Sequence, residues 1–255
     1  MRQSKHRKQK GENNIMNNYG LQLYSLRDIT KKNLKGALKK VSKMGYKMVE
    51  SAGFFGHSAK KVRKWLDKYG LEICSTHTGI DLLEKDFDAN IEYHKALGCK
   101  DLIIPWAPFN TKDELDALVD KINEWLPKAK EAGITLHYHN HHSEFLPNED
   151  GQIAIEELAK RTDINFEIDT YWAYVAGQNP LEVLDKYDSR IKFIHLKDGY
   201  ENHEGKSLGQ GTAPVLDVLR KAEQMKKTIV VESEGLDPTG IEEVGRCMEF
   251  LKANQ

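Results

Sequence analysis

The sequence has little of what marks secreted, membrane-bound or nucleic-acid-binding proteins. Its three cysteines are scattered without CxxC spacing, so reduced thiols are their expected state. No apolar stretch approaches the length of a membrane span, and no signal-peptide core is present. An excess of one charge is also lacking, because 38 Lys and Arg residues face 39 Asp and Glu residues. We therefore expect a soluble, cytoplasmic protein with neither a nucleic-acid nor a membrane partner, and homo-oligomerisation stays open.

The first 18 residues differ from the rest of the chain. They contain five Lys or Arg residues, one acidic residue and few apolar side chains, which is typical of a disordered basic tail. A basic arm for nucleic acid is an alternative, and Met16 offers an alternative start of the natural chain. A length of 255 residues fits one large domain or two small ones. The repeating pattern that begins at residue 19 favours one domain, residues 19–255.

From residue 19 onward, a short β-rich run alternates with an amphipathic stretch eight times. The β-rich runs occupy residues 19–25, 46–51, 71–77, 101–107, 134–141, 164–173, 191–197 and 228–233. The amphipathic stretches occupy residues 33–45, 58–70, 87–98, 111–133, 153–162, 180–187, 213–225 and 241–253. The longest of them repeats apolar residues every three or four positions, and Pro127 is expected to bend or split it. Gly45, Gly70, Gly98 and Gly133 stand where helices are expected to end.

This alternation determines the predicted fold class. Strand–helix repeats require a parallel sheet, and eight of them favour closure into a single (β/α)8 TIM barrel of the α/β class. A doubly wound open sheet is the alternative, but it usually has a glycine-rich first turn. The first turn here, SLRDITKKN, contains no glycine.

Four consecutive predicted strands end on residues that could bind a metal: His139, Asp169, His195 and Glu232. Working residues of such barrels lie at the carboxyl ends of strands, and strand alternation directs these four side chains to the face opposite the helices. Each alone has a plainer interpretation, a core histidine or a structural ion pair. Together, at adjacent strand ends, they predict a site for one divalent cation. Two imidazoles and two carboxylates suit Mn, Co or Zn better than Mg.

The order and spacing of several motifs make the chain resemble the sugar (phosphate) isomerase/epimerase group of the xylose-isomerase-like TIM barrels. The motifs are GLQLYSLRD, GYKMVE, YHNHHSEF, FEIDTYWAYVAGQNPLEVL, IHLKD, LGQGT and VVESEG, and the likeness covers nearly all of residues 19–251. The resemblance implies one metal that bridges two adjacent substrate oxygens, with Asp169, His195 and Glu232 at the family's ligand positions. Two positions depart from it. His139 stands where many epimerases have Glu in a LENH-like motif, and Trp172 stands where a His is common, which counts against two-base epimerisation.

The implied function is a metal-dependent sugar isomerase or epimerase that removes a proton next to a metal-chelated carbonyl. Glu232 is the predicted base as well as a ligand, and His77 and Lys197 are candidates for moving protons between oxygens. For Lys197, a salt bridge to Asp198 or Glu234 is an equally good interpretation. The predicted substrate-binding residues are Tyr24, Glu50, Trp106, His141 and Trp172. For Glu50 a structural ion pair, and for the aromatic residues core packing, are the plainer alternatives.

Three other functions remain open. The same site can eliminate a group β to the carbonyl, which would make the chain a lyase or dehydratase acting on a keto-sugar or an inosose. An apurinic endonuclease shares this barrel but needs more metal ligands and a basic groove, which the near-zero net charge argues against. A sugar-binding barrel without catalysis would keep the aromatic residues and bind no metal. Phosphorylation of the substrate is unresolved, because LGQGT is either an anion-binding loop or a simple turn.

Overall fold

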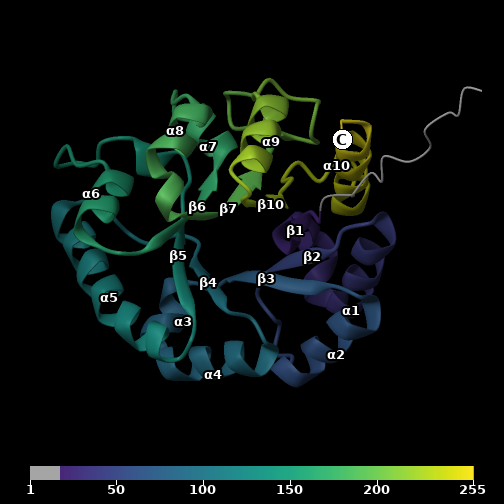
Figure 1. Cartoon of the computed structure of the whole chain (residues 1–255), viewed down its shortest axis with the longest axis horizontal. Coiled ribbons are helices and arrows are strands. Elements are labelled where there is room, and N and C mark those ends of the chain that lie inside the picture. Colours follow the sequence, from purple (N-terminus) through teal and green to yellow (C-terminus); the bar gives the residue numbers. More distant parts are fainter. Residues whose placement is uncertain (1–17, 255) are drawn as a thin grey trace, which may run out of the picture.

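The computed structural model describes residues 18–254 as a closed barrel of eight parallel strands with helices outside it (Figure 1). The tail predicted at residues 1–18 lies, apart from Asn18, outside the described residues. The strands in chain order are β1 (Gly20–Gln22), β2 (Met48–Ala52), β3 (Glu72–His77), β4 (Asp101–Ile104), β5 (Thr135–His139), β6 (Asn165–Asp169), β7 (Ile191–Leu196) and β10 (Thr228–Val231). Each pairs with its neighbour, and β1 pairs in parallel with β10 to close the ring. The predicted fold class is confirmed.

The helices follow the strands in the predicted order. They are α1 (Arg27–Met44), α2 (Ala59–Tyr69), α3 (Ile80–Lys85), α4 (Phe87–Leu97), α5 (Lys112–Glu131), α6 (Ala154–Arg161), α7 (Thr170–Val175), α8 (Pro180–Tyr187), α9 (Val215–Gln224) and α10 (Gly240–Ala253). Gly70 and Gly98 end α2 and α4 in the left-handed conformation, as expected for glycine C-caps. The helix α5 continues through Pro127, so of the bend or split expected there the split does not occur.

The described chain departs from strict alternation at three places, all beyond the carboxyl ends of strands. Two helices, α3 and α4, follow β3, and two more, α7 and α8, follow β6. A small antiparallel hairpin of β8 (Asp198–Gly199) and β9 (Gly205–Lys206) follows β7. The short 3-10 helices η1 (Leu23–Leu26), η2 (Ser143–Phe145) and η3 (Asp188–Arg190) complete the described elements. None of the described helices combines the length and apolar composition of a transmembrane span.

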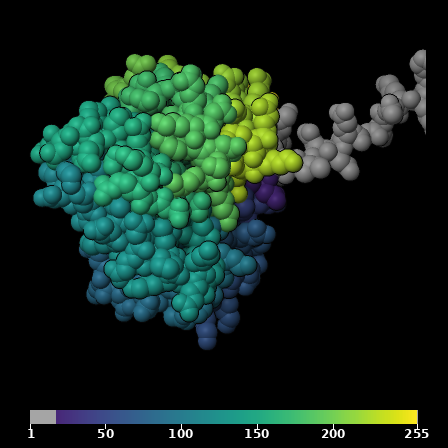
Figure 2. All heavy atoms as spheres, turned by 60° about the vertical axis from the view of Figure 1, so that its left-hand side comes forward, coloured from purple at the N-terminus to yellow at the C-terminus, as the bar shows by residue number. Residues whose placement is uncertain are grey.

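The main hydrophobic core lies between the strands and the helices. It includes the strand residues that alternation directs toward the helices, one or three positions before each predicted metal-ligand residue: Leu136, Ile168, Ile194 and Val231. A second, smaller core fills the barrel interior, where Ile103, Phe193 and Val230 pack together. At the surface, the yellow C-terminal segment lies next to the purple start of the described chain (Figure 2), as the β1–β10 pairing requires. The barrel is therefore closed, and apolar side chains fill part of its interior.

Candidate active site

The four predicted metal ligands converge at the carboxyl ends of β5, β6, β7 and β10. The strand register places Asp169 beside His195, and His195 beside Val230. One ligand atom from each of the four predicted ligand residues, an imidazole nitrogen or a carboxylate oxygen, lies within 4.8 Å of the other three, and all four residues are buried. The Nε2 atom of His139 is 3.2 Å from His195 Nδ1 and 3.7 Å from Asp169 Oδ2. The Nδ1 atom of His195 is 3.4 Å from Glu232 Oε2.

These spacings fit a small divalent cation. Ligand bonds of about 2.0–2.2 Å at tetrahedral angles separate ligand atoms by about 3.3–3.6 Å. The distances from His195 Nδ1 to the other three residues and from His139 to Asp169 are 3.2–3.8 Å, close to this range. The donor set of two imidazoles and two carboxylates suits Zn, Mn or Co.

Asp169 shows the fit most directly, because its two oxygens have different surroundings. Its Oδ1 atom accepts hydrogen bonds from the backbone N–H groups of Tyr171 (2.9 Å) and Trp172 (3.0 Å) and thereby caps α7. Its Oδ2 atom is buried without a hydrogen-bond partner among residues 18–254. A buried carboxylate oxygen without a hydrogen-bond partner costs free energy. A cation bound between Asp169 Oδ2 and the other three candidate ligands would remove this cost.

Two buried carboxylates, those of Glu50 and Glu167, fix the orientation of the His195 ring. Its Nε2 atom lies 2.7 Å from Glu50 Oε1 and 3.2 Å from Glu167 Oε2, so the N–H at this position donates to carboxylates. The other nitrogen, Nδ1, faces the ligand group. Burial lowers the pKa of His195, but Glu167 and Glu50 outweigh this effect and raise the pKa well above its ordinary value, so a cation that binds at Nδ1 would displace a proton. Such a carboxylate behind the imidazole fixes the tautomer of a metal-binding histidine.

The protonation states of the group are governed by burial and by Lys197. Burial lowers the pKa of His139 to about 4, which keeps its imidazole neutral at pH 7, the form that binds metals. Burial raises the pKa of Asp169 and of Glu232, but the Lys197 ammonium outweighs this effect, and both pKa values lie below their ordinary range. The Lys197 Nζ atom is 3.4 Å from Glu232 Oε2 and forms an ion pair with Glu234. Of the two salt bridges considered for Lys197, the one to Glu234 is the one that forms.

A second polar layer lies beneath the ligand group and includes Glu167, which the sequence analysis did not select. His77 Nε2 is 2.7 Å from Glu167 Oε2 and 3.1 Å from Glu50 Oε1. Burial lowers the pKa of His77, but the two carboxylates outweigh it and raise this pKa to about 10. His77, His139, Glu167 and His195 also approach one another closely enough to hold a metal. Because His77 and Glu167 already bind each other, the upper group is the better candidate for holding a cation.

A cavity of about 390 Å³ opens above the ligand group. Five of the predicted site residues line it: Tyr24, His77, His139, His141 and Glu232. Tyr24 belongs to η1 rather than to a strand, and the residue is 45% exposed. Burial, with His139 nearby, lowers the pKa of His141 to about 3, so this imidazole is also neutral at pH 7.

Other predicted substrate-binding residues lie elsewhere. Glu50 is fully buried below the cavity, where Gln22, Ser75 and His195 bind its oxygens. Trp106 follows β4 and is 51% exposed on the rim. Trp172 lies in α7, 5.8 Å from the His141 ring, and the Lys197 ammonium lies 4.4 Å from the centre of its indole.

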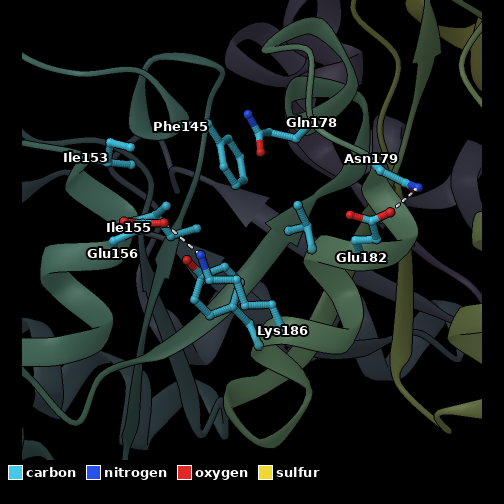
Figure 3. Close-up of a pocket in the computed structure, with 10 residues that line it drawn as sticks. Phe145, Ile153, Ile155, Glu156, Gln178, Asn179, Glu182 and Lys186 are labelled. Atoms are coloured by element: carbon cyan, nitrogen blue, oxygen red, sulfur yellow. Dashed lines mark hydrogen bonds and ion pairs between the residues drawn. The ribbon is translucent and has the colours of Figure 1, made fainter.

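A separate hollow of about 250 Å³ lies on the outside of the barrel between α6 and α8. It holds a Glu156–Lys186 ion pair and a hydrogen bond from Asn179 to Glu182 (Figure 3). No predicted ligand or base lines it, so the cavity above the four ligands is the candidate active site.

Comparisons with known proteins agree with the barrel fold. A family model described as xylose isomerase-like TIM barrel matches residues 38–254. The inosose dehydratase of Geobacillus kaustophilus is 27% identical over 186 residues, which cover 63% of this chain and 60% of that protein. The inosose dehydratase of Clostridium beijerinckii is 25% identical over 198 residues, covering 67% of this chain and 65% of that protein. The chain therefore spans less than two thirds of the length of these two relatives.

A solved structure extends the likeness to nearly the whole chain. The crystal structure of a sugar phosphate isomerase/epimerase from Parabacteroides distasonis superimposes with a TM-score of 0.82 at 25% identity. The match covers 95% of this chain and 96% of the other.

Proposed function

We propose that this chain, which belongs to the xylose isomerase-like TIM barrel family, is a divalent-metal-dependent isomerase or epimerase of a small carbohydrate. The observation that carries the proposal is the double position of Glu232. Its carboxylate belongs to the four-residue ligand group and also lines the cavity in which a substrate would bind. A carboxylate at this position can bind a cation and take a proton from the substrate beside it.

The chain's own residues divide the work of proton transfer. A divalent cation, when bound, polarises a carbonyl and stabilises the negative charge that develops on its oxygen. Glu232 takes the proton from the neighbouring carbon, and its low pKa keeps it ionised for this role. His77, which lines the cavity and has a raised pKa, is the proton donor to an oxygen of the substrate. Lys197 stabilises the charge of Glu232 from 3.4 Å away.

The remaining predicted residues have supporting roles in this proposal. His141 and Tyr24 contact the substrate from the cavity wall. Trp172 covers Lys197, and Trp106 stands at the entrance of the cavity. Glu50 holds His77 and His195 in position from below and does not reach the substrate.

Hydrogen exchange tests the proposal directly. Ketohexoses, ketopentoses, inososes and 3-keto-glycosides are incubated with the metal-loaded enzyme in deuterated water and followed by NMR. Deuterium in an isomeric sugar of unchanged formula supports the isomerase or epimerase. Absence of exchange with every member of the panel, despite bound metal, would overturn it.

A dehydratase is the second candidate, and two observations favour it. The two curated relatives named above are inosose dehydratases. In addition, His139 stands at the end of β5, where the epimerase pattern has a carboxylate, so a second carboxylate base is missing from this side of the described site. Elimination needs one base and one acid, which Glu232 and His77 would supply. Loss of water with a growing enone absorbance, in the same experiment, distinguishes this outcome.

A further inference from the structure

The exposed apolar side chains of the described residues are concentrated on one face of the barrel. The large hydrophobic side chains that are most exposed are Tyr24, Phe55, Leu82, Trp106, Leu146 and Tyr200. Each of them follows the carboxyl end of a different strand. Exposed apolar surface that gathers around one opening marks a binding surface. The face that holds the candidate active site therefore carries several exposed apolar side chains, and two of them, Tyr24 and Leu82, line its cavity.

Part of this apolar surface is continuous with the cavity. Tyr24, Leu82 and Pro105 line the cavity together with Ala52 and Gly53, all from the β1–β4 half of the barrel. The metal-ligand group lies on the opposite half, at the ends of β5, β6, β7 and β10. A substrate held by its oxygens at the ligand group would thus extend over an apolar shelf, which we define as Tyr24, Ala52, Gly53, Leu82 and Pro105.

The loop that the sequence suggested for anion binding is already occupied by a side chain of this chain. In LGQGT (residues 208–212), the N–H groups of Gly209 and Gly211 donate to Asp198 Oδ2 over 2.8 and 3.0 Å. The N–H of Ala213, just after it, donates to Asp198 Oδ1 over 3.3 Å. Asp198 is buried, so its carboxylate takes the place that a phosphate group would need.

The cations near the cavity wall are engaged as well. No Lys or Arg is among the described residues that line the cavity. Lys197 is buried and paired with Glu232 and Glu234. Arg27 donates to the backbone oxygens of Tyr24 and Glu234.

The charge of a loaded site follows from these contacts. A divalent cation, Lys197 and His77, whose raised pKa keeps it protonated at pH 7, together supply four positive charges. The carboxylates of Asp169, Glu232, Glu234 and Glu50 balance these charges. A phosphate dianion therefore finds no net attraction at this site.

We propose, building on the function proposed above, that the substrate is an unphosphorylated keto-carbohydrate with an apolar substituent that rests on the apolar shelf. The shelf supplies the apolar contact. Two features exclude a phosphate: Asp198 already binds the amides of the loop at residues 208–212, and the charges of the loaded site balance. This assignment separates the chain from enzymes that act on sugar phosphates.

A matched set of ligands tests the assignment through binding rather than turnover. The probes are 3-keto-glucose, its 4-nitrophenyl β-glycoside and its 6-phosphate, titrated into the full chain by calorimetry with and without Zn. We expect the aryl glycoside to bind at least about tenfold more tightly than the free sugar, because its ring is removed from water on the shelf. We expect the phosphate to bind at least about tenfold more weakly than the free sugar. Saturation-transfer NMR should locate the protein contact on the aryl protons.

Two variants provide the matched control. Leu82→Ser should reduce the aryl advantage to about threefold or less, because it removes apolar contact from the shelf. Leu146→Ser alters another exposed leucine of the rim that does not line the cavity, and it should leave all three affinities unchanged. Equal binding of the aryl glycoside and the free sugar, or tighter binding of the phosphate, overturns the assignment. A dimer that Leu82→Ser dissociates also overturns it, because a second copy would then cover the shelf.

Hydrogen exchange separates this inference from the proposed function. Exchange that is faster with the phosphate than with the neutral sugars refutes the substrate class and leaves the function standing. Preferred binding of the aryl glycoside without any exchange refutes the function and leaves the substrate class standing.

Discussion

Asp169 allows metal binding to be separated from folding, because its two oxygens do different work. Asp169→Asn keeps the Oδ1 atom that caps α7 and replaces the unpartnered Oδ2 with an amide nitrogen, which is a poor metal ligand. Asp169→Ala removes both. We expect the metal affinity of both variants to fall by a factor of about 100 or more. Only the Ala variant should lose the cap, which is worth about 1 kcal/mol.

The magnitude follows from linkage between binding and stability. At a metal concentration 100 times its Kd, binding stabilises the wild-type fold by about 2.7 kcal/mol. If the Kd of Asp169→Asn rises 100-fold, the same metal concentration stabilises the variant by only about 0.4 kcal/mol. Chemical denaturation with and without Zn, Mn or Co measures both values, and calorimetry gives the Kd independently.

A second capping residue provides the control. Asn179 caps α8 by accepting from the Leu181 N–H and lies outside the ligand group. Asn179→Ala should therefore cost about 1 kcal/mol and leave the gain from metal intact. Undiminished stabilisation of Asp169→Asn by metal would refute the assignment of Oδ2 as a ligand. Equal stability of the metal-free Asn and Ala variants would refute the capping role.

Three further predictions concern the base, the response to acid and the N-terminal segment. Glu232→Gln should slow hydrogen exchange about 100-fold or more while weakening substrate binding less, and full exchange in this variant would transfer the base to His77 or Lys197. Burial raises the pKa of Asp101, but His137 and Lys192 outweigh it and lower this pKa below its ordinary value. The stabilisation by this carboxylate is therefore present above the ordinary pKa of Asp and is lost as the pH falls through the lowered pKa of Asp101. The free energy of unfolding of the wild type should thus fall more than that of Asp101→Asn between pH 6 and the acid limit of folding. An equal fall in both proteins would contradict this. Removal of residues 1–15 should leave the melting temperature and turnover unchanged, whereas aggregation of the shortened chain would show that the segment is needed.

The fold and the ligand group could be predicted because both depend on short-range periodicity. Strand alternation alone determines that His139, Asp169 and His195 face away from the helices, and barrel closure then brings them together. Alternation also separates Lys197 from Asp198. The first contacts Glu234 at the site, and the second binds the amides of its own loop.

Two features could not be predicted from the sequence: the layer of the barrel interior that an inward-facing side chain enters, and the residue at which a strand gives way to a helix. Glu167 shares the inward face with Asp169, but alternation does not tell which layer of the barrel a side chain enters. For the same reason the sequence predicts that Glu50 binds the substrate, although this residue is fully buried beneath the cavity. Tyr24 and Trp172 belong to helices that begin directly after β1 and β6, where an apolar, aromatic run looks like a continued strand. The course of α5 through Pro127 is another tertiary effect, because packing of its apolar face outweighs the local cost of the proline.

The closure of the ring also determines when the protein can fold. Gly20 of β1 pairs with Val230 of β10, and α1 contacts α10. One neighbour of the first strand is therefore synthesised more than 200 residues after it. Until then, the growing chain has an unpaired edge on β1 and lacks Glu232, the ligand that follows the last strand. Contacts of such large sequence separation are slow to form, and open strand edges associate with other chains. During synthesis, the interval before α10 is complete is thus the period in which this protein depends most on protection from aggregation.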